Sequence, residues 1–343
     1  MAMHIIKALP QPEELVSLYP VPESAAICKR QIDTALAGIF TGQSQRKVLL
    51  IGPCSADREA PVLDYCIRLA RLQERVADRL LLLPRVYTHK PRTTGDGYKG
   101  MLHQPDPTEK PDFCKGLMAV RRLHWRVLTE SGLSTADEML YPSNYAYLQD
   151  ILSYLTVGAR SVENQEHRMI ASGMDIPVGM KNPVGGDLHA MLHAIHTAQK
   201  PHRNLYRGFE VQTDGNPLAH AILRGFTDLD GEMHANCGEE NLLALYRLYA
   251  QTDLKNCALI VDCNHANSAK QYLLQPQICL DVLHSCRQHP ELSAMVKGFM
   301  IESYLEDGCQ SSTGSVYGQS LTDPCLGWGK TEQLVLELAE RIA

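Results

Sequence analysis

Short apolar runs alternate along this chain with longer segments in which apolar residues recur every three or four positions. A short apolar run predicts a buried strand, and the longer period predicts an amphipathic helix. Residues 47–51 form such a run, and residues 60–79 follow with the helical period. The positions that keep this period are Val62, Leu63, Cys66, Leu69, Leu72 and Val76. The first unit of the pattern is therefore a predicted strand followed by a predicted helix.

The same alternation continues to the end of the sequence. Strands are predicted at 47–51, 80–87, 133–139, 157–160, 176–182, 219–224, 257–262 and 296–301. Helices are predicted at 60–79, 111–130, 144–155, 188–199, 239–251, 277–287 and 330–342, with one more before residue 176. Strands that alternate with helices form a parallel sheet with crossover helices. Eight such units predict an α/β fold, a closed (β/α)8 TIM barrel with its functional groups at the carboxyl ends of the strands.

An open, doubly wound sheet is the alternative arrangement. No Gly-x-Gly-x-x-Gly follows the first predicted strand, so the dinucleotide-binding version of that fold has no support. Residues 1–45 are predicted to be a short N-terminal extension of a regulatory or oligomerisation type, broken by prolines and carrying a helix at 23–40. The catalytic barrel is expected over residues 46–343.

Composition and charge narrow the class of protein. The chain has 343 residues, 44% hydrophobic and 21% charged, which is typical of a soluble globular protein. A net charge of -6 argues against a nucleic-acid partner. No apolar run reaches membrane-spanning length, so no membrane partner is expected. The 11 cysteines are scattered without Cys-x-x-Cys pairs, which favours a cytoplasmic protein over a disulfide framework.

Polar residues gather at the predicted strand ends, where a barrel would bring them to one mouth. One group consists of Cys54, His265, Glu302 and, in the loop after the last strand, Asp323. A thiolate, an imidazole and two carboxylates can hold a divalent transition metal and are too soft a set for magnesium alone. Each has an ordinary alternative, because a lone buried cysteine behaves as a small apolar residue and His265 could cap a local turn.

A second group at the same strand ends is cationic. Its members are Arg85, Lys90, Arg92, Arg160, Lys181 and Arg224. Six cations at one mouth would repel each other unless anions neutralise them, so the expected ligand carries more than one phosphate or carboxylate. The alternative is that some of them pair with acids such as Glu138 or Glu163.

Ordered motifs from both groups carry a family resemblance. They are Gly52-Pro53-Cys54-Ser55, Lys90-Pro91-Arg92-Thr93, Gly158-Ala159-Arg160, Pro177-Val178-Gly179-Met180-Lys181-Asn182, Ile222-Leu223-Arg224-Gly225, His265-Ala266-Asn267-Ser268 and Ile301-Glu302-Ser303. Residues 164–168 and 321–328 extend the match. The chain resembles the type I 3-deoxy-D-arabino-heptulosonate 7-phosphate (DAHP) synthases, in the branch sensitive to an aromatic amino acid.

This resemblance implies condensation of phosphoenolpyruvate with erythrose 4-phosphate and release of phosphate, the first step of the shikimate pathway to aromatic amino acids. The expected catalytic residues are Lys90, Arg85, Cys54 and His265. Positions that match the phosphoenolpyruvate contacts are Arg85, Lys90, Arg160, Lys181 and Arg224, and those around erythrose 4-phosphate are Lys90, Pro91, Arg92 and Thr93. The implied ligands of one divalent metal, manganese, iron or cobalt with zinc as an alternative, are Cys54, His265, Glu302 and Asp323. A homodimer or homotetramer is expected.

The chain departs from the family pattern in three places. It has Ala56-Asp57-Arg58 where Ile-His-Asp is usual. Residues 95–100 replace the usual Gly-Trp-Lys-Gly element, with an extra residue before it, and Pro183-Val184-Gly185-Gly186 follows Lys181-Asn182. None removes a named ligand, but each bears on the substrate loops and the sugar preference. A related synthase that uses arabinose 5-phosphate and a catalytically silent phosphometabolite-binding protein are the competing functions.

The segment 202–217 bears on regulation. It is shorter than the family's inhibitor-binding hairpin and carries the charged residues Arg203, Arg207, Glu210 and Asp214. A pocket for an aromatic ring needs concave apolar walls with a few placed polar groups. We therefore expect inhibition by phenylalanine, tyrosine or tryptophan to be weak or absent. The alternative is that the hairpin is merely trimmed and the pocket survives.

Overall fold

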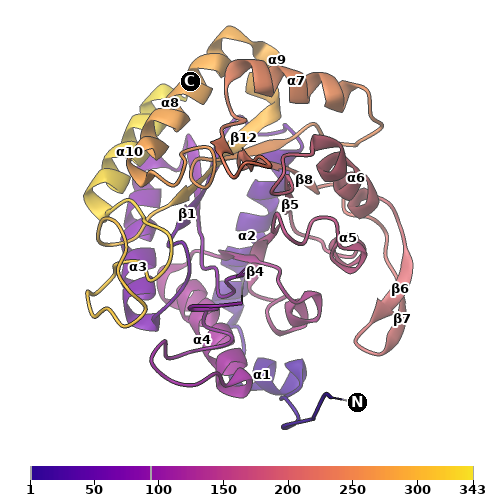
Figure 1. Ribbon diagram of the computed structural model, residues 1–343, viewed down its shortest axis with the longest axis vertical. Coiled ribbons are helices and arrows are strands. Elements are labelled where there is room, and N and C mark those ends of the chain that lie inside the picture. Colours follow the sequence, from indigo (N-terminus) through magenta and orange to yellow (C-terminus); the bar gives the residue numbers. More distant parts are fainter. Residues whose placement is uncertain (1, 93–94, 343) are drawn as a thin grey trace.

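A computed structural model of the chain, which describes residues 2–92 and 95–342, shows eight parallel strands ringed by helices (Figure 1). The strands are β1 (Lys47–Gly52), β2 (Leu80–Pro84), β3 (Thr135–Glu138), β4 (Leu152–Val157), β5 (Val178–Lys181), β8 (His220–Leu223), β11 (Leu259–Asp262) and β12 (Val296–Glu302). Their order is β2-β1-β12-β11-β8-β5-β4-β3. A parallel bridge between Arg85 and Ala136 brings the two edge strands together. The predicted (β/α)8 barrel is confirmed.

Alternate residues of each strand face two different cores, as the period of two in a strand requires. Val48 and Leu50 of β1 belong to a cluster inside the barrel, whereas Leu49 and Ile51 pack with the surrounding helices. Because both faces are covered, β1 and most of the other strands are buried over their whole length. This double burial explains why the strands appear in the sequence as continuous apolar runs.

The outer helices follow the strands in chain order. They are α3 (Glu59–Val76), α4 (Phe113–Ser131), α5 (Gln165–Ala171), α6 (Leu188–Gln199), α7 (Glu239–Ala250), α8 (Gln275–Gln288), α9 (Pro290–Met295) and α10 (Trp328–Arg341), with a short 3-10 helix η2 (Tyr272–Leu274). The amino-terminal segment adds α1 (Pro12–Leu18) and α2 (Glu23–Phe40). None of the helices among the described residues is long and apolar enough to span a bilayer.

Helix α2 closes one end of the barrel. Its last turns place Leu36, Ile39 and Phe40, all essentially inaccessible to solvent, in the interior cluster. The Phe40 ring lies 4.1 Å from the ring of His220 at the start of β8, centroid to centroid. Since His220 is at the amino end of its strand, α2 covers the end of the barrel opposite to the strand carboxyl ends. The mouth left open is the one where the polar strand-end residues lie.

The fourth unit differs from the sequence prediction. The helix predicted at 144–155 and the strand predicted at 157–160 are wrong: the chain forms a 3-10 helix η1 (Pro142–Tyr147) and then β4. β4 pairs with β3 on one side and β5 on the other, so all six of its residues are buried. An apolar run without alternation is compatible with either element, and only the strand pairing decides between them.

Two antiparallel hairpins were not assigned as strands from the sequence. β6 (Arg203–Tyr206) and β7 (Phe209–Gln212) project from the barrel after α6, and β9 (Phe226–Thr227) pairs with β10 (Met233–His234) (Figure 1). The β6–β7 turn is made by Arg207 and Gly208, both with positive φ, the geometry of a two-residue type I′ hairpin. The Arg207 guanidinium reaches Glu13 of α1, 3.4 Å away, so the hairpin leans on the amino-terminal segment.

Candidate active site

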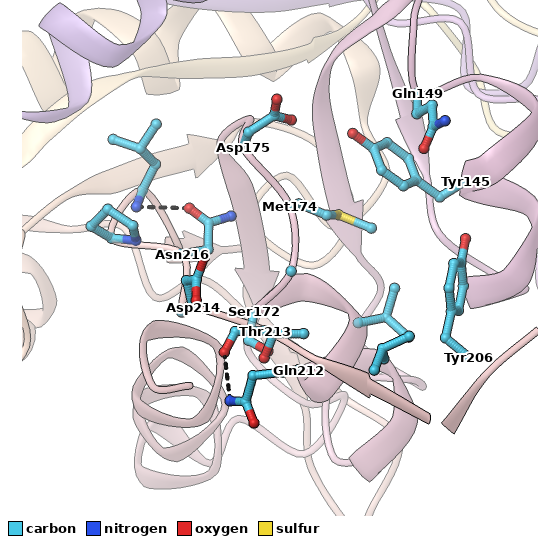
Figure 2. A pocket seen from close by; sticks show the side chains of 16 residues that line it. Tyr145, Gln149, Ser172, Met174, Asp175, Tyr206, Gln212, Thr213, Asp214 and Asn216 are labelled. Carbon is cyan, nitrogen blue, oxygen red and sulfur yellow. Dashed lines mark hydrogen bonds between the residues drawn. The ribbon is translucent and has the colours of Figure 1, made fainter. Parts of the chain in front are cut away.

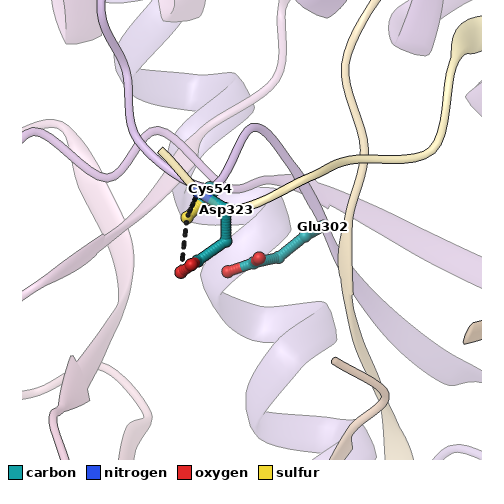
Figure 3. Close-up of side chains that lie close together, drawn as sticks. All are labelled: Cys54, Glu302 and Asp323. Carbon is teal, nitrogen blue, oxygen red and sulfur yellow. Dashed lines mark hydrogen bonds between the residues drawn. The ribbon is translucent and has the colours of Figure 1, made fainter. Parts of the chain in front are cut away.

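Three of the four predicted metal ligands lie together at the open mouth of the barrel (Figure 3). The ligand atoms of Cys54, Glu302 and Asp323 are all within 4.8 Å of one another. Cys54 follows β1 and Glu302 ends its neighbour β12, so strand pairing alone brings these two close. Asp323 arrives on the loop after β12, which returns to the barrel through a bridge between Ser303 and Leu326.

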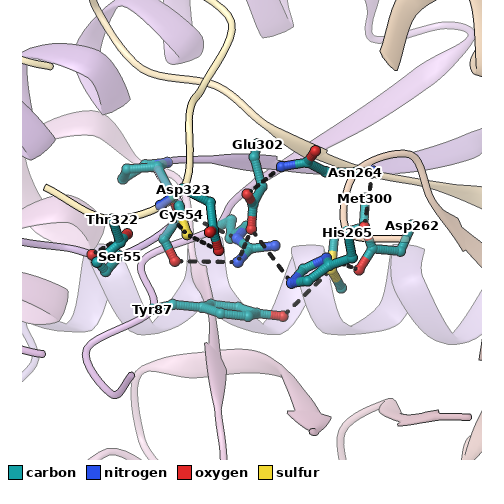
Figure 4. A network of polar contacts seen from close by, with 12 residues as sticks. Cys54, Ser55, Tyr87, Asp262, Asn264, His265, Met300, Glu302, Thr322 and Asp323 are labelled. Atoms are coloured by element: carbon teal, nitrogen blue, oxygen red, sulfur yellow. Dashed lines mark hydrogen bonds and ion pairs between the residues drawn. The ribbon is translucent and has the colours of Figure 1, made fainter. Parts of the chain in front are cut away.

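His265, the fourth predicted ligand, borders this cluster and is oriented by an acid (Figure 4). Its Nε2 lies 3.9 Å from Glu302 Oε1, and its Nδ1 lies 2.8 Å from Asp262 Oδ2 at the end of β11. A carboxylate at one ring nitrogen sets the tautomer that presents the other nitrogen to a metal. His265 has a φ of 51°, in the left-handed region that histidine enters uncommonly.

The charges in the cluster fit a cation. Burial, and then the negative charge of Glu302, raises the pKa of Cys54 to about 12, although the positive charges of Lys90 and Arg85 oppose this rise. Sulfur, imidazole and carboxylate donors suit a divalent transition metal. The residues present therefore fit the implied metal, with Cys54, Glu302 and Asp323 as the close set and His265 beside them.

Lys90 is the cation that contacts the cluster directly. Its Nζ lies 2.7 Å from Cys54 Sγ and 3.1 Å from Asp323 Oδ2. Burial disfavours the charged form, but the charges of Cys54 and Asp323 outweigh it and raise the pKa of Lys90 above its usual range. A second ammonium, Lys270, lies 3.2 Å from Asp323 Oδ1. Burial opposes the charge on Asp323, yet the two lysines hold its pKa below the usual range.

Arg85 is fixed between the cluster and the barrel interior. It is almost wholly buried, and its Nη2 lies 2.8 Å from Glu302 Oε1 and 3.3 Å from the Cys54 carbonyl oxygen. The guanidinium also stacks 4.0 Å from the ring centre of Tyr87. Burial lowers the pKa of Arg85, but Glu302 reverses this effect and raises it overall. Its Nε donates to the Pro53 carbonyl oxygen, whereas the other terminal nitrogen, Nη1, is buried without a hydrogen-bond partner in the described chain.

The predicted cations line one cavity next to the metal cluster. Five of the six cations come from the ends of four strands, β2, β4, β5 and β8: Arg85, Lys90, Arg160, Lys181 and Arg224. The cavity touches Cys54 and His265 as well. Lys181 is paired with Asp262 at 3.3 Å. Arg224 Nη1 is buried with no hydrogen-bond partner among the described residues, and burial lowers the pKa of this arginine. Donors buried in this way are suited to an anionic ligand.

Of the remaining predicted substrate residues, one lines the cavity, one does not, and one lies outside the described residues. Pro91 lines the cavity, and Glu138 at the end of β3 is its one carboxylate among the described lining residues. Arg92 is not part of the described lining, and its Nε donates a hydrogen bond to the Tyr98 carbonyl 2.9 Å away. Thr93 lies outside the described residues, so its predicted place is a matter for experiment.

Sequence reasoning missed His89, which also lines the cavity. Its Nε2 is buried without a hydrogen-bond partner in the described chain, and its Nδ1 lies 3.2 Å from Thr88 Oγ1 and 3.7 Å from Asp137 Oδ2. Asp137 also contacts His124. Burial raises the pKa of Asp137, but His124 and His89 outweigh this effect, so the pKa is lowered overall. A histidine directly before Lys90, and an acid one residue before Glu138, were the available sequence signals.

A second cavity, of about 560 Å³, lies beside the β6–β7 hairpin (Figure 2). Tyr145 of η1 and Tyr206 of β6 lie on the same side of it, and Met174 projects between the walls. Two carboxylates, Asp175 and Asp214, also line it, and no lysine, arginine or histidine does so among the described residues. The trimmed hairpin therefore still builds an apolar wall, while the charges lining this cavity are negative.

Comparisons with known proteins agree on one family. Residues 22–336 match the model of the DAHP synthetase I family. The Trp-sensitive phospho-2-dehydro-3-deoxyheptonate aldolase of Escherichia coli K12 is 34% identical over 98% of this chain and 96% of its own length. The Phe-sensitive protein of the same strain is 35% identical, over 98% and 95% respectively. A solved phospho-2-dehydro-3-deoxyheptonate aldolase from Francisella tularensis SCHU S4 superposes with a TM-score of 0.92 at 29% identity, covering 99% of this chain and 98% of its own.

Proposed function

The chain belongs to the DAHP synthetase I family, and on that premise we propose that it condenses phosphoenolpyruvate with erythrose 4-phosphate to give DAHP and phosphate. The observation that carries this proposal is the junction of two sites at one barrel mouth. A cavity lined by five cations opens directly onto the cluster of Cys54, Glu302 and Asp323. The cations suit the phosphate and carboxylate groups of the two substrates, and the cluster suits one divalent metal.

The cations bind and orient the anions. Phosphoenolpyruvate would be held by Arg85, Lys90, Arg160, Lys181 and Arg224, a proposal that their shared cavity supports. Lys90 and Pro91, with Arg92 and Thr93, would contact erythrose 4-phosphate. Two anions repel each other in water, and a preformed ring of cations removes that repulsion and fixes their relative position. This effect lowers the barrier before any proton moves.

Cys54, His265, Glu302 and Asp323 would hold a divalent manganese, iron or cobalt ion, or zinc as an alternative. A bound ion of this kind supplies Lewis-acid polarisation of the aldehyde carbonyl. Asp262 positions His265 for this role through the 2.8 Å contact to Nδ1. Arg85 holds Glu302, so the carboxylate is kept in place by a group that also faces the substrate cavity.

The reaction joins the enol carbon of phosphoenolpyruvate to the aldehyde carbon of the sugar. Water then adds at the former enol carbon, which carries the phosphate ester, and phosphate leaves with its bridging oxygen. The oxygen of the former aldehyde must gain a proton as the new bond forms. Lys90 keeps its ammonium proton at Nζ, lines the cavity and touches the metal cluster, so it is the proposed donor.

A phosphate-release assay tests the proposed function. Purified protein is supplied with phosphoenolpyruvate and either erythrose 4-phosphate or arabinose 5-phosphate, before and after treatment with a chelator. We expect release with erythrose 4-phosphate, loss of release on chelation, and recovery with manganese, iron or cobalt. Release only with arabinose 5-phosphate would replace the proposal with the related synthase. Tight binding of phosphoenolpyruvate without release, in metal-loaded protein, would indicate a catalytically silent binding protein.

A further inference from the structure

A second group of cations lies at the end of the barrel opposite to the candidate active site. Lys47 is the first residue of β1, and Lys297 is the second residue of the adjacent strand β12. The carboxyl ends of these two strands carry Gly52 and Glu302, which are paired to each other. At about 3.3 Å per residue, the five steps from Lys47 to Gly52 span about 16 Å. The two groups of cations therefore cannot share one ligand of metabolite size.

A cavity of about 450 Å³ opens at this end between the α2–β1 connection, the α8–α9 region and the start of β12. Its lining contains four cations, Arg46, Lys47, Arg287 and Lys297, and no carboxylate among the described residues. The whole chain has a net charge of -6, so acidic residues outnumber basic ones. A cavity lining whose charged residues are all basic therefore differs from the chain as a whole. Like charges around one cavity repel each other, and a bound anion would relieve that repulsion.

Three of these cations use backbone carbonyl groups as partners. Lys47 Nζ donates to the carbonyl oxygens of Ser293 and Val296, at 2.8 and 2.5 Å. Arg46 donates to the Ala77 carbonyl and Arg287 to the Arg341 carbonyl. A neutral carbonyl satisfies a donor but leaves its charge unbalanced. The positive charge of the cavity is therefore held in place by the fold without being neutralised by a side chain.

Lys297 is the cation whose position most needs a ligand. It is only 9% exposed, and the described chain offers its ammonium neither a hydrogen bond nor an ion pair. Its Nζ approaches the turn at Gly42, where a Cβ would lie 3.7 Å away. Burial lowers the pKa of Lys297 and lowers that of Lys47 to about 8. The Lys297 side chain is largely buried while it lines the cavity, so an anion in the cavity could neutralise its charge.

We propose that this cavity is a second, separate anion site that binds a small phosphate ester or a comparable polyanion. Its anionic group would contact Lys297 and Lys47 at the floor and Arg287 at the rim. Four cations without a carboxylate favour a ligand with at least two negative charges. The volume lies within the range of small-molecule sites. The proposal does not depend on which reaction the barrel mouth catalyses.

Crystals soaked in millimolar selenate test the location, because selenate is a tetrahedral dianion that anomalous scattering identifies. We expect a peak beside Lys297 Nζ in addition to any peak at the barrel mouth. In Lys297→Met, which keeps an apolar side chain of similar length, the first peak should vanish and the peaks at the mouth should remain. A peak that persists unchanged in Lys297→Met would mark an adventitious ion only and would overturn the proposal, as would no peak in the parent protein.

A solution measurement tests the affinity. Inorganic phosphate is titrated calorimetrically into metal-loaded protein that is saturated with phosphoenolpyruvate. We expect Lys297→Met and Arg287→Gln each to weaken this binding by about tenfold or more, the size expected for a lost charged hydrogen bond. Lys255→Met removes the same charge from an exposed position outside the cavity lining. This control variant should bind phosphate with the affinity of the parent protein. Circular dichroism confirms that each variant is folded. Equal affinity in the parent and in Arg287→Gln and Lys297→Met would refute the proposal.

Discussion

At the scale of single residues, the candidate site depends on charges that hold one another in defined states. Lys90 keeps its proton because Cys54 and Asp323 surround its ammonium. Glu302 is held by Arg85, and His265 is held by Asp262. Lys90, Glu302 and His265 therefore each have a neighbour that fixes either the charge or the direction of the side chain.

Replacing Lys90 with alanine should lower turnover by at least about 10²-fold, since general acid catalysis contributes ~10²–10⁴-fold. The fold should remain, because the Lys90 side chain projects into the cavity and not into the apolar core. Steady-state kinetics of phosphate release would measure the change, with circular dichroism as the check on folding. Lys255→Ala, an exposed lysine elsewhere, is the matched control. Turnover above about a tenth of the parent value would contradict a proton-transfer role.

A thiol pair at the metal cluster should make the apo-protein sensitive to oxidation. The Cys54 backbone N–H lies 3.4 Å from Cys325 Sγ, so the second sulfur does approach the first residue, as its place two positions after Asp323 predicts. An added oxidant such as hydrogen peroxide would take two electrons and two protons from these thiols and join them, if their Cα atoms lie within the usual ~4.4–6.8 Å. Peptide mapping of oxidised, metal-free protein should recover the Cys54–Cys325 linkage.

A second pair of thiols provides the control for this experiment. Cys263 Sγ and Cys279 Sγ are buried 3.3 Å apart. Cys279→Ser should leave the rate of oxidative inactivation unchanged, whereas Cys325→Ser should slow it. If Cys325→Ser is inactivated as fast as the parent, the proposed pair is not the cause.

At the scale of elements, α2 belongs to the barrel core although it precedes the first strand. Phe40→Ala should destabilise the protein by about 3–5 kcal/mol, the usual cost of truncating a buried phenylalanine, because its ring packs on His220 and Tyr154 inside the barrel. Urea denaturation would measure the free energy of unfolding. Ile27→Ala, on the exposed side of the same helix, should cost under about 1 kcal/mol. Equal effects of the two changes would show that α2 does not close the barrel.

The β6–β7 hairpin bears on regulation. Its Tyr206 supplies an apolar wall that could hold an aromatic ring, but the described cavity lining contains Asp175 and Asp214 and no cation for an amino acid's carboxylate. We therefore predict weak or absent inhibition by phenylalanine, tyrosine and tryptophan, although the relatives include proteins named Trp-sensitive and Phe-sensitive. Steady-state assays at millimolar concentrations of each would decide. Micromolar inhibition that Tyr206→Ala abolishes would show that the shortened hairpin still forms an effector site.

At the scale of the whole molecule, the metal cluster joins distant parts of the chain. Cys54 follows β1, Glu302 ends β12 and Asp323 lies in the loop that precedes α10, with His265 after β11 beside them. A ligand that binds only the folded state stabilises the whole protein. The proposed metal should therefore link the first and last strands of the barrel energetically as well as catalytically. The expected homodimer or homotetramer, and the role of residues 1–45 in it, remain proposals that sedimentation would test.

Chelation should inactivate the protein and also lower its melting temperature, and added manganese, iron or cobalt should reverse both changes. His265→Ala should weaken metal binding strongly, because the site loses its imidazole donor. Metal content measured by mass spectrometry and thermal unfolding report on this change without relying on activity. Full activity in exhaustively chelated protein whose metal content reads zero would refute the metal-dependent mechanism.

Much of this architecture is encoded locally in the sequence. The apolar runs and helical periods predicted eight strand–helix units, and the polar residues directly after the runs predicted the mouth of the barrel. These predictions succeed because the side-chain period and the end of an apolar run are properties of neighbouring residues. The family motifs worked for the same reason, since each is a short stretch at one strand end. Cys54, Glu302 and Asp323 were found in this way and do lie together.

Other features depended on contacts between residues far apart in the chain. Strand β4 was mistaken for a helix because only pairing with β3 and β5 distinguishes the two. His89 contacts Asp137, and the cavity around Lys297 is lined by cations from several segments. No local sequence pattern predicts either feature, because the residues involved are far apart in the chain. Burial raises the pKa of Cys54, whereas neighbouring charges raise the pKa of Lys90 against the effect of burial. The sequence by itself determined the kind of fold and the chemical groups at its mouth, whereas the tertiary structure decided their partners, charges and directions, because these depend on distances through space.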